Sequence, residues 1–431
     1  MYKIIRFLTL LFVFLIPWQA RWIMIPGSLN GIYWEYGTQS FYATEAIVFV
    51  LLMLLLAIAF RRRHTIRFSS FASAARNPAV LFVLWALLSA LWAIEPSMAL
   101  EHAVFLIEGL CIALVIGSGI VSLESILWTV IASAFLQASA GLAQFFVQYV
   151  PGSTMLGMAS QDPSTLGVSV VETASARWLR AYGTFPHPNM LAGWLVMGIV
   201  SVWLVTQSLR DECTRITRAC AIKYANRMLI LFVLVFGLLA TFSRSAYLAA
   251  GLFGAVLVLW YGAQKKHRTV LAVFALSGIL ASLLFCALYG DILRSRATSA
   301  TELDTRSQSE RISYLHEART LISQSPVLGF GLGNYGYAVF KHIDADREAW
   351  AYQPVHDIGV LLLTELGLVG LMLMLLILYK GIVAVSHISQ VFIFIPVLVI
   401  GFFDHYFVSF YSGVMMVSVM VGIFLLKIGK K

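Results

Sequence analysis

Charged residues are scarce in this chain: only 12% of its 431 residues are Asp, Glu, Lys or Arg, against 60% hydrophobic residues. A soluble domain carries about a quarter of its residues as charged side chains. So much apolar surface cannot be buried in a water-soluble core, and the apolar runs of about 20 residues have the length of membrane-spanning helices. The shortage of charge therefore excludes a soluble protein and predicts an integral membrane protein.

Other absences narrow the class further. Alternation of apolar and polar residues over about ten residues, the pattern of an outer-membrane barrel, is missing. The four cysteines show no zinc-ligand spacing, and we expect no disulfide framework. No carboxylate cluster resembles a Mg²⁺ or Mn²⁺ site, so we expect no metal. The formal net charge is +9, but the basic residues gather at the ends of apolar runs, which indicates membrane topology and no nucleic-acid partner.

The apolar runs predict an all-α, polytopic membrane protein with about twelve transmembrane helices in a single integral membrane domain, residues 1–431. The first run lacks a convincing small-x-small cleavage site, so we expect it to remain as the first helix. The predicted spans are 4–19, 42–60, 79–94, 103–121, 125–149, 189–208, 228–242, 246–262, 269–289, 356–379, 388–403 and 409–426.

One arginine, Arg244, stands inside the long apolar stretch 228–262. A charge at the centre of a bilayer costs about 3 kcal/mol on insertion scales. A single helix over this stretch would be roughly 50 Å long, far more than the hydrocarbon core of about 30 Å. The stretch must therefore form two spans, and FSRSA, residues 242–246, is the only polar candidate for the turn. This places Arg244 at a membrane face.

The distribution of Lys and Arg predicts which face this is. With the N-terminus in the cytoplasm, nineteen of these residues fall on the inner side and eleven on the outer side, where Arg244 lies. Positive charge is usually enriched on the cytoplasmic side, and long loops contribute little to that bias. An even number of spans then returns the C-terminus to the cytoplasm.

Two of the predicted outer loops are long: residues 150–188 and residues 290–355. In the second loop, residues 310–335 predict an amphipathic helix followed by a Gly-rich turn, residues 329–333. We expect this helix to lie against the membrane surface or to cap a cavity. The apolar stripe of this helix is expected to contain Ile312, Leu315, Ala318 and Ile322.

Polar residues that are unusual near a membrane converge on this outer face. Five segments that are far apart in the sequence deliver cations, histidines and carboxylates to it. The candidate site residues are Arg180, His187, Asn189, Arg244, Arg311, His356, Asp357, Glu365, Asp404 and His405.

Each candidate also has a purely structural interpretation. An arginine in a turn between spans can reach the lipid headgroups. A histidine at a helix start, such as His187, is often only an N-terminal hydrogen-bonding group, and Pro188 fits the first turn of a helix. Glu365 could merely pair with a basic neighbour. The functional interpretation therefore depends on the convergence of these residues and not on any one of them.

Several arginines and a histidine at one membrane face suit a particular chemistry. Arginine binds phosphate oxygens with a planar fork and keeps its charge, and a neutral histidine can accept a proton near pH 7. Together they fit a lipid whose diphosphate is a leaving group and an acceptor hydroxyl that has to be activated. The arginines would then stabilise the charge on the departing diphosphate, a role that a metal ion has elsewhere.

Four motifs in this order resemble the signatures of the O-antigen ligase and O-antigen polymerase-like membrane glycosyltransferases. The resemblance covers residues 177–375, and the five spans before it match in hydropathy only. The motifs are RAYGTFPHPNMLAGW, TFSRSAYLA, ERISYLHEA with PVLGFGLGNY, and HDIGVLLLTELGLVGL.

The resemblance implies a metal-independent, inverting glycosyltransferase that needs no cofactor. Such an enzyme moves a glycan from undecaprenyl diphosphate to a hydroxyl at the outer face of the bacterial inner membrane. Carried over by motif, Arg180, Arg244 and Arg311 would bind the diphosphate. His356 would be the general base, or would orient the acceptor hydroxyl.

The remaining candidates would line the substrate pocket. By the resemblance, His187 and Asn189 shape the sugar–diphosphate region. The family often has Asn or Ser directly after the catalytic histidine, whereas this chain has Asp357. That carboxylate would orient the histidine, raise its basicity or mark a different acceptor. Glu365, Asp404 and His405 complete the expected pocket.

The acceptor separates the possible functions. Ligation of O-antigen to lipid A–core is the first choice, and polymerisation of a surface polysaccharide is the alternative that shares the donor. Protein O-oligosaccharyltransferases of the group usually carry extra soluble mass, so a protein acceptor is less favoured.

Other protein classes fit the sequence less well. A transporter of the lipid-linked glycan would place polar groups near mid-membrane, often with inverted repeats, and no repeat is visible. A non-catalytic scaffold would not need the arginines and histidines. Other membrane proteins of glycan assembly are possible partners.

Overall fold

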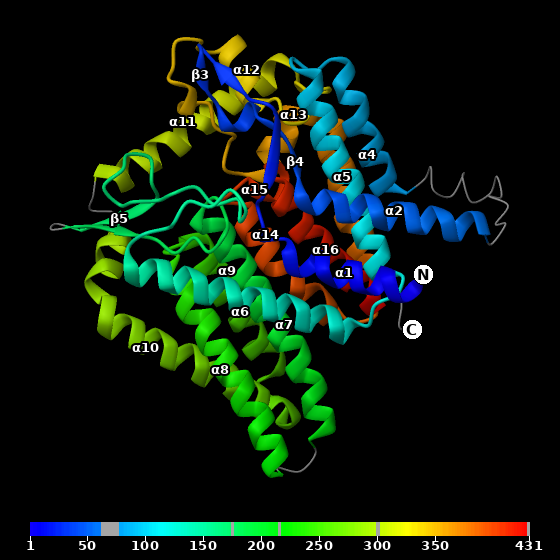
Figure 1. Cartoon of the computed structure of the whole chain (residues 1–431), viewed down its shortest axis with the longest axis vertical. Helices are drawn as coiled ribbons and strands as arrows, with labels where there is room; N and C mark the ends of the chain where they lie inside the picture. The colour runs from blue at the N-terminus through cyan, green and yellow to red at the C-terminus, as the bar shows by residue number, and fades with distance from the viewer. Residues whose placement is uncertain (62–76, 174–175, 214–216, 299–301, 429–431) are drawn as a thin grey trace.

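The computed structural model describes residues 1–61, 77–173, 176–213, 217–298 and 302–428. Helices form most of this part of the chain, and a smaller layer of loops, short strands and short helices covers their upper end (Figure 1). The two termini lie close together at one side of the molecule. The architecture agrees with an all-α, polytopic membrane protein.

The α-helices are α1 (Tyr2–Leu15), α2 (Ala43–Arg61), α4 (Pro78–Leu88), α5 (Pro96–Gly117), α6 (Leu123–Val147), α7 (Pro188–Glu212), α8 (Arg218–Ala240), α9 (Arg244–Tyr261), α10 (Arg268–Thr298), α11 (Glu302–Gln324), α12 (Tyr335–His342), α13 (Ile358–Ala384), α14 (Ile395–Gly401), α15 (Tyr406–Ser409) and α16 (Tyr411–Ile428). The short 3-10 helices are η1 (Glu35–Gly37), η2 (Ser89–Leu91), η3 (Lys265–His267), η4 (Ala349–Ala351) and η5 (Ile388–Phe394).

Within the described residues, eight helical segments are long and apolar enough to cross a membrane. They are α5, α6, α7, α8, α9, α13, α16 and the segment Lys265–Arg296, which combines η3 with most of α10. Shorter apolar helices occupy Ala43–Ile58, Pro78–Leu91 and Ile388–Gly401. Each predicted span therefore contains helix, while the count of twelve crossings stays a prediction.

The predicted hairpin at Arg244 is confirmed. Helix α8 ends at Ala240 and α9 begins at Arg244, so the turn is Thr241–Ser243. The chain reverses at Phe242, which adopts a left-handed backbone conformation with φ of 50°. A non-glycine residue in that region is uncommon and is tolerated where packing fixes it; Phe242 is fully buried.

Helix α7 is the most buried of the spanning helices and contacts α6, α8, α9, α10 and α14. Small residues allow this close packing, as is usual between helices in a membrane. A Cβ atom on Gly198 would lie 2.7 Å from Ala134 Cβ of α6, which leaves no room for a side chain. Because α7 is held on all sides, its first turn is a rigid support for any site built there.

The described residues include six short strands, which lie in the upper layer. The N-terminal part of the chain contributes β1 (Arg21–Ile25), paired antiparallel with β4 (Gln39–Tyr42), and β2 (Ser28–Leu29), paired with β3 (Ile32–Tyr33). The predicted loop 150–188 contains the hairpin of β5 (Val170–Glu172) and β6 (Arg177–Leu179). The sequence analysis did not foresee this small amount of strand.

The predicted loop 290–355 contains the expected helix, α11, followed by a Gly-rich turn and α12. The orientation expected for its apolar stripe is wrong in part. Ala318 is buried, but Ile312 and Leu315 are 59% and 48% exposed. The buried face is formed by Tyr314, Glu317, Ala318 and Leu321. The reason is that the helix packs on the 344–352 segment through polar as well as apolar groups.

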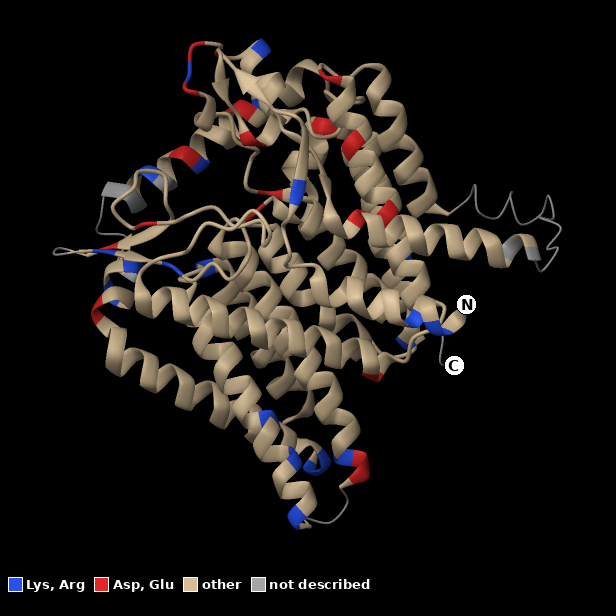
Figure 2. Ribbon diagram, in the orientation of Figure 1, with Lys and Arg blue, Asp and Glu red and all other residues tan. Residues whose placement is uncertain are grey.

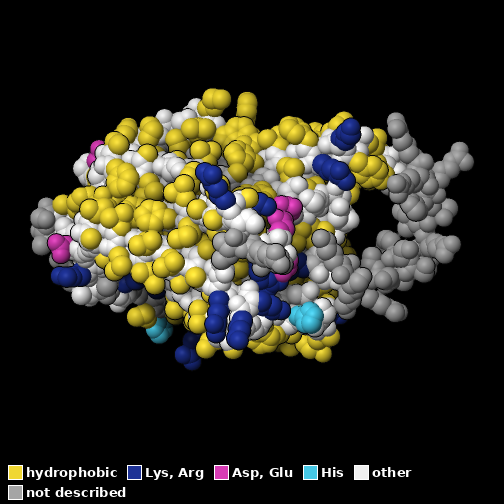
Figure 3. All heavy atoms as spheres, turned by 90° about the horizontal axis from the view of Figure 1, so that it is seen from below, with side chains coloured by type: hydrophobic (Ala, Val, Ile, Leu, Met, Phe, Trp, Pro, Cys, Tyr) yellow, Lys and Arg dark blue, Asp and Glu magenta, His cyan; other side chains and the backbone are white. Residues whose placement is uncertain are grey.

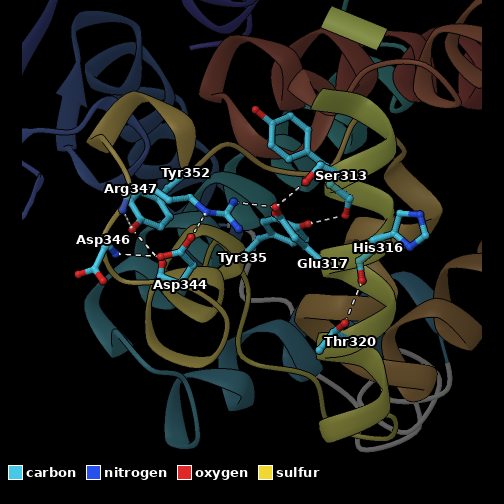
Figure 4. A network of polar contacts seen from close by, with 10 residues as sticks. Ser313, His316, Glu317, Thr320, Tyr335, Asp344, Asp346, Arg347 and Tyr352 are labelled. Atoms are coloured by element: carbon cyan, nitrogen blue, oxygen red, sulfur yellow. Dashed lines mark hydrogen bonds and ion pairs between the residues drawn. The ribbon is translucent and has the colours of Figure 1, made fainter. Parts of the chain in front are cut away.

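A polar network joins α11 to that segment (Figure 4). Arg347 Nη1 donates to Glu317 Oε1 at 2.6 Å, and Arg347 Nε donates to Asp344 Oδ2 at 3.0 Å. The Tyr352 hydroxyl accepts from the Arg347 backbone N–H at 3.0 Å and donates to the Asp344 carbonyl at 2.9 Å. These contacts neutralise the negative charge of the buried Glu317 carboxylate and fix α11 relative to the loop that leads to α13.

A disulfide joins Cys213, directly after α7, to Cys220 in the first turn of α8. The expectation that the cysteines form no disulfide is therefore wrong for this pair, because the end of α7 and the start of α8 bring the two residues together. Cys111 and Cys286 are free thiols.

Charge is unevenly distributed over the molecule. Lys and Arg gather at the lower tip, where α8 begins, and near the N-terminus, while Asp and Glu are more frequent in the upper half (Figure 2). The orientation in which the lower end faces the cytoplasm is inferred from these same basic residues and stays a prediction.

Candidate functional site

His356, Asp404 and His405 form the centre of the candidate site. His356 precedes Asp357, the N-cap of α13, and the other two residues lie in the connection between α14 and α15. His356 Nδ1 lies 3.7 Å from Asp404 Oδ1, and the rings of His356 and His405 have centroids 5.0 Å apart. Asp404 and His405 are buried, whereas 22% of the His356 side chain is exposed. His356 is therefore the member of the cluster that a substrate can reach.

Hydrogen bonds link this cluster to Arg180. Asn189 Nδ2 donates to Asp404 Oδ2, and Asn189 Oδ1 accepts from Arg180 Nη2, both at 2.7 Å. Arg180 also donates from Nε to the Thr241 carbonyl at 2.6 Å and from Nη1 to Ser169 Oγ at 2.7 Å. Its guanidinium is thus buried and held on three sides. These contacts favour a positioning role for Arg180 over direct contact with a diphosphate.

The start of α7 places Asn189. His187 is the N-cap residue of this helix, and its Nδ1 accepts a hydrogen bond from the Asn189 backbone N–H at 3.1 Å. Pro188 occupies the first turn, where its missing N–H costs nothing. The structural interpretation of His187 and Pro188 as a helix start is therefore confirmed, and this start fixes Asn189 between Arg180 and Asp404.

The surroundings keep two of the three histidines neutral. Burial, together with the nearby His356, lowers the pKa of His405 to about 3. Burial and the charge of Arg180 lower the pKa of His187 to about 3 as well. Burial alone would raise the pKa of the Asp404 carboxyl, but its interaction with His356 outweighs burial and holds that pKa well below its usual range. At neutral pH the site therefore contains a carboxylate directly beside His356.

Arg244 and Arg311 bring positive charge to the edge of this cluster. Arg244 is exposed at the first residue of α9, and Arg311 is half-buried on α11. Burial lowers the pKa of Arg311, and the charges of both Asp404 and Arg244 act on it as well. Arg311 on α11 therefore feels the charges of Asp404 and of Arg244 on α9, although these elements are distant in the sequence.

Three helices begin at this end of the molecule: α7 after His187, α9 after Ser243 and α13 after Asp357. The N-terminus of a helix carries partial positive charge and free N–H groups, which favour an anion nearby. Together with Arg244 and Arg311, these helix ends give the site a positive field on one side of the His356–Asp404 pair.

Two expected pocket residues, Asp357 and Glu365, make hydrogen bonds that stabilise the local backbone. Asp357 Oδ1 accepts a hydrogen bond from the Val360 backbone N–H at 2.8 Å, so this carboxylate caps α13. The carboxylate that lies beside the His356 ring is that of Asp404, 3.7 Å from Nδ1. Glu365 is buried and accepts from the backbone N–H groups of Gly333 at 2.9 Å and Tyr335 at 3.1 Å. Glu365 therefore anchors the Gly-rich turn, which favours a structural role for it.

The same three central residues are a possible set of metal ligands, which the sequence analysis did not foresee. One ligand atom each of His356, Asp404 and His405 can be chosen so that all lie within 4.8 Å of one another. Two ligands of one zinc ion lie roughly 3.3 Å apart, since each is about 2.0 Å from the metal. His405 Nδ1 is also 3.0 Å from Ser409 Oγ, at hydrogen-bond distance. The set is therefore wider than a formed metal site, and metal independence stays a prediction.

Sequence reasoning missed several residues that the fold brings to the site. Ser169 and Thr241 hold Arg180, and Tyr314 of α11 lies against His356 with ring centroids 6.0 Å apart. Arg296, near the end of α10, lowers the pKa values of both Arg180 and His187. For Arg296 and Tyr314 the sequence offered one signal, their position in the predicted outer loop 290–355.

Part of the chain that carries this site is similar to known proteins. Residues 229–375 match the family model described as O-antigen ligase. A protein of Rickettsia conorii named "Putative polysaccharide ligase" is 27% identical over 168 residues, which cover 38% of this chain and 40% of that protein. A protein of Rickettsia felis with the same description is 29% identical over 169 residues, with the same coverage. The chain thus spans about 40% of the length of these relatives.

The matched region contains the α8–α9 turn with Arg244, helix α11 with Arg311, the Gly-rich turn, and His356 at the start of α13. Arg180, Asn189 and Asp404 lie outside it, and the fold alone joins them to His356. Over residues 229–375, the chain is therefore similar to the O-antigen ligase family.

Proposed function

We propose that this protein transfers a glycan from a polyprenyl diphosphate, such as undecaprenyl diphosphate, to an acceptor hydroxyl at the outer face of the bacterial inner membrane. The observation that carries this proposal is the arrangement around His356. An accessible histidine stands beside a buried carboxylate, and two arginines and three helix N-termini lie on the surrounding elements. This combination provides a proton acceptor and a binding region for a phosphate anion in one place.

His356 is the proposed general base. As the acceptor oxygen forms its bond to the anomeric carbon of the glycan, the hydroxyl proton passes to the histidine ring. The carboxylate of Asp404, 3.7 Å from His356 Nδ1, stabilises the positive charge that the ring then gains. Attack from the side opposite the leaving group inverts the configuration at that carbon.

Arg244 and Arg311 are the proposed diphosphate-binding residues. The bond between the anomeric carbon and the diphosphate oxygen breaks, and the electron pair leaves with the oxygen. Guanidinium groups bind phosphate oxygens in a planar, bidentate manner, and they stabilise the charge that grows on the leaving group. In this proposal Arg180 does not bind the diphosphate itself. It holds Asp404 in place through Asn189.

The acceptor that we propose is lipid A–core, which makes the reaction an O-antigen ligation. Polymerisation of a surface polysaccharide would use the same donor and the same base with a glycan hydroxyl as acceptor. The test is therefore a transfer assay with purified full-length protein and polyprenyl-diphosphate glycan, in which lipid A–core and a second copy of the lipid-linked glycan are offered separately.

The assay includes a chelator and two pairs of matched variants. His356→Ala should abolish transfer, whereas His316→Ala, an exposed histidine on α11, should not affect it. Arg244→Lys should be strongly impaired because a point charge cannot replace the fork, whereas Arg319→Lys, exposed on α11, should behave as the wild type. Full transfer by His356→Ala would refute the base assignment, and loss of activity with the chelator would refute the metal-free mechanism. Transfer to the lipid-linked glycan alone would replace the ligase by the polymerase.

A further inference from the structure

A second polar region lies at the opposite end of the helix bundle. Helix α7 begins at His187 in the candidate site and ends at Glu212. Its 25 residues rise about 37 Å, which is enough to cross the hydrocarbon core. The end of α7, the start of α8 and the end of α9 therefore lie at the other membrane face from His356.

A cavity of about 790 Å³ opens at this end, between α6, α7, α8, α9, η3, η5 and α16. Its volume is within the usual range for a small-molecule site. The lining contains five cationic side chains, Arg210, Lys223, Arg227, Lys266 and Lys427, and two carboxylates, Glu124 and Glu212. Lys223 pairs with Glu212 at 2.8 Å. The lining thus keeps an excess of positive charge, and Figure 3 shows Lys and Arg gathered on this largely hydrophobic face.

Two N–H donors in the lining lack an acceptor within the described part of the chain. The Nε atom of Arg227 and the Nε2 atom of Gln207 are both buried, and neither has a hydrogen-bond partner there. A buried donor without an acceptor is unfavourable, because it has given up its hydrogen bond to water. Arg227 is held in place by Trp128, with its guanidinium carbon 4.2 Å from the ring centroid. The wall of the cavity therefore contains two N–H groups that the described part of the protein leaves without an acceptor.

Aromatic residues line the same cavity: Trp128, Trp203, Trp260 and Tyr261. Tryptophan and tyrosine are enriched where a membrane protein meets the headgroup region of the bilayer. Trp260 is 48% exposed on the surface of the bundle. An occupant would thus meet apolar and aromatic surface as well as cations, a combination that fits an amphipathic anion better than a free inorganic one.

We propose that this cavity binds the phosphate headgroup of an anionic phospholipid from the leaflet opposite the His356–Asp404 site. Basic pockets between transmembrane helices are suited to such headgroups. The phosphate would accept hydrogen bonds from Arg227 and Gln207, and Lys266 and Lys427 would add attraction from the facing elements. The proposal is independent of the glycan-transfer function, because it involves none of the residues assigned to that reaction.

The test is a lipid titration of the purified full-length protein in detergent, followed by native mass spectrometry. The probes are dioleoyl phosphatidylglycerol, dioleoyl phosphatidylcholine and inorganic phosphate. The double variant Arg227→Gln with Lys266→Gln removes two cations of the lining. The matched control, Arg218→Gln with Lys265→Gln, removes two exposed cations from the same helix α8 and from the same η3, outside the lining.

We expect phosphatidylglycerol to bind more tightly than phosphatidylcholine. The cavity variant should weaken phosphatidylglycerol binding by roughly tenfold or more, and the control variant should leave it within about twofold. Equal weakening in both variants, or equal binding of the two lipids, would overturn the proposal. Binding of inorganic phosphate as tight as that of phosphatidylglycerol would overturn the lipid assignment in favour of a free anion.

A change in folding must be separated from a loss of binding. Melting temperatures of both double variants provide this control. If the cavity variant is unstable, Lys266→Gln is compared with Lys265→Gln, because these lysines are adjacent and only the first lines the cavity. The single lining substitution should still weaken phosphatidylglycerol binding relative to its neighbour, and an equal effect would refute the proposal.

Discussion

At the scale of single residues, Asn189 is the connection on which the candidate site depends. Its amide binds a cation on one side and a carboxylate on the other, at 2.7 Å each. Hydrogen bonds to charged groups contribute more than neutral ones, roughly 1.5–3 kcal/mol. A small change at this residue should therefore affect His356 through Asp404, although Asn189 is not assigned to bind substrate.

We expect Asn189→Ala to slow glycan transfer about 30-fold, which corresponds to roughly 2 kcal/mol in the activation free energy. Arg180→Ala should have a similar effect, and the double variant should be little worse than either single one, because both changes release the same carboxylate. Transfer rates of the three variants test this, with Asn226→Ala, exposed on α8, as the control. Additive losses would show that Arg180 and Asn189 act separately. Direct binding of the diphosphate would then be the better assignment for Arg180.

The buried histidines give the protein a dependence of stability on acid. The pKa of His405 is about 3 in the folded protein, mainly because of burial, and about 6.5 in an unfolded chain. Between these values the unfolded chain binds more protons, so stability is complete above pH 6.5 and falls as the pH drops. For His405 alone the loss is about 2 kcal/mol between pH 6.5 and pH 5.

The melting temperature of the purified protein should therefore decrease from pH 6.5 to pH 5. His405→Asn, which removes the titrating group and keeps a polar partner for Ser409, should show a smaller decrease over the same range. Differential scanning fluorimetry at several pH values measures both. An identical pH dependence in the variant and the wild type would mean that His405 is not buried in its neutral form.

At the scale of elements, the outer helix α11 connects two parts of the molecule. Its Arg311 reaches the electrostatic environment of Asp404, and its buried Glu317 is held by Arg347 from the segment that precedes α13. The element that carries a proposed diphosphate-binding residue is therefore positioned by an ion pair on its other side.

We expect Arg347→Ala to weaken the packing of α11 on the 344–352 segment by roughly 1–3 kcal/mol, because it leaves the buried Glu317 carboxylate without its cation. The double variant with Glu317→Gln should recover part of the loss, since it also removes the buried charge. Limited proteolysis of the outer loop and melting temperatures measure the effect, with the exposed Arg319→Ala as control. Lack of recovery in the double variant would indicate that Arg347 acts through Asp344 instead.

At the scale of the whole molecule, two observations favour opposite orientations of the protein in the membrane. The count of Lys and Arg places the turn between α7 and α8 in the cytoplasm, and the structure places a disulfide at this turn. Disulfides are rare in the reducing cytoplasm. Since α7 joins this turn to the candidate site, its location decides on which side of the membrane His356 works.

We expect the turn to face the cytoplasm, where the Cys213–Cys220 disulfide of the structure would be open to reduction. A variant that keeps only Cys213 should react with a membrane-impermeant maleimide only after permeabilisation. A variant whose single cysteine replaces the exposed His316 of α11 should react in intact spheroplasts. Labelling in the opposite sense would invert the topology and place the glycan-transfer site in the cytoplasm, which contradicts the proposed function.

The sequence by itself determined the class of protein and the main helices, because membrane burial requires long apolar runs that are visible one by one. It also determined the α8–α9 hairpin, since the 228–262 stretch is too long for one crossing and has one polar turn. The convergence of Arg244, Arg311 and His356 on one end followed from the order of the spans and from motifs that resemble one family.

Only the tertiary structure decided which side chains touch. Asp404, and not the adjacent Asp357, lies beside His356, because Asp357 Oδ1 satisfies the backbone N–H of Val360 at the start of α13. Arg180 is buried under the site and Glu365 is bound to the Gly-rich turn. The cavity at the opposite face joins side chains from seven elements. Such pairings depend on distances between elements far apart in the chain, which the spacing of residues along one helix does not contain.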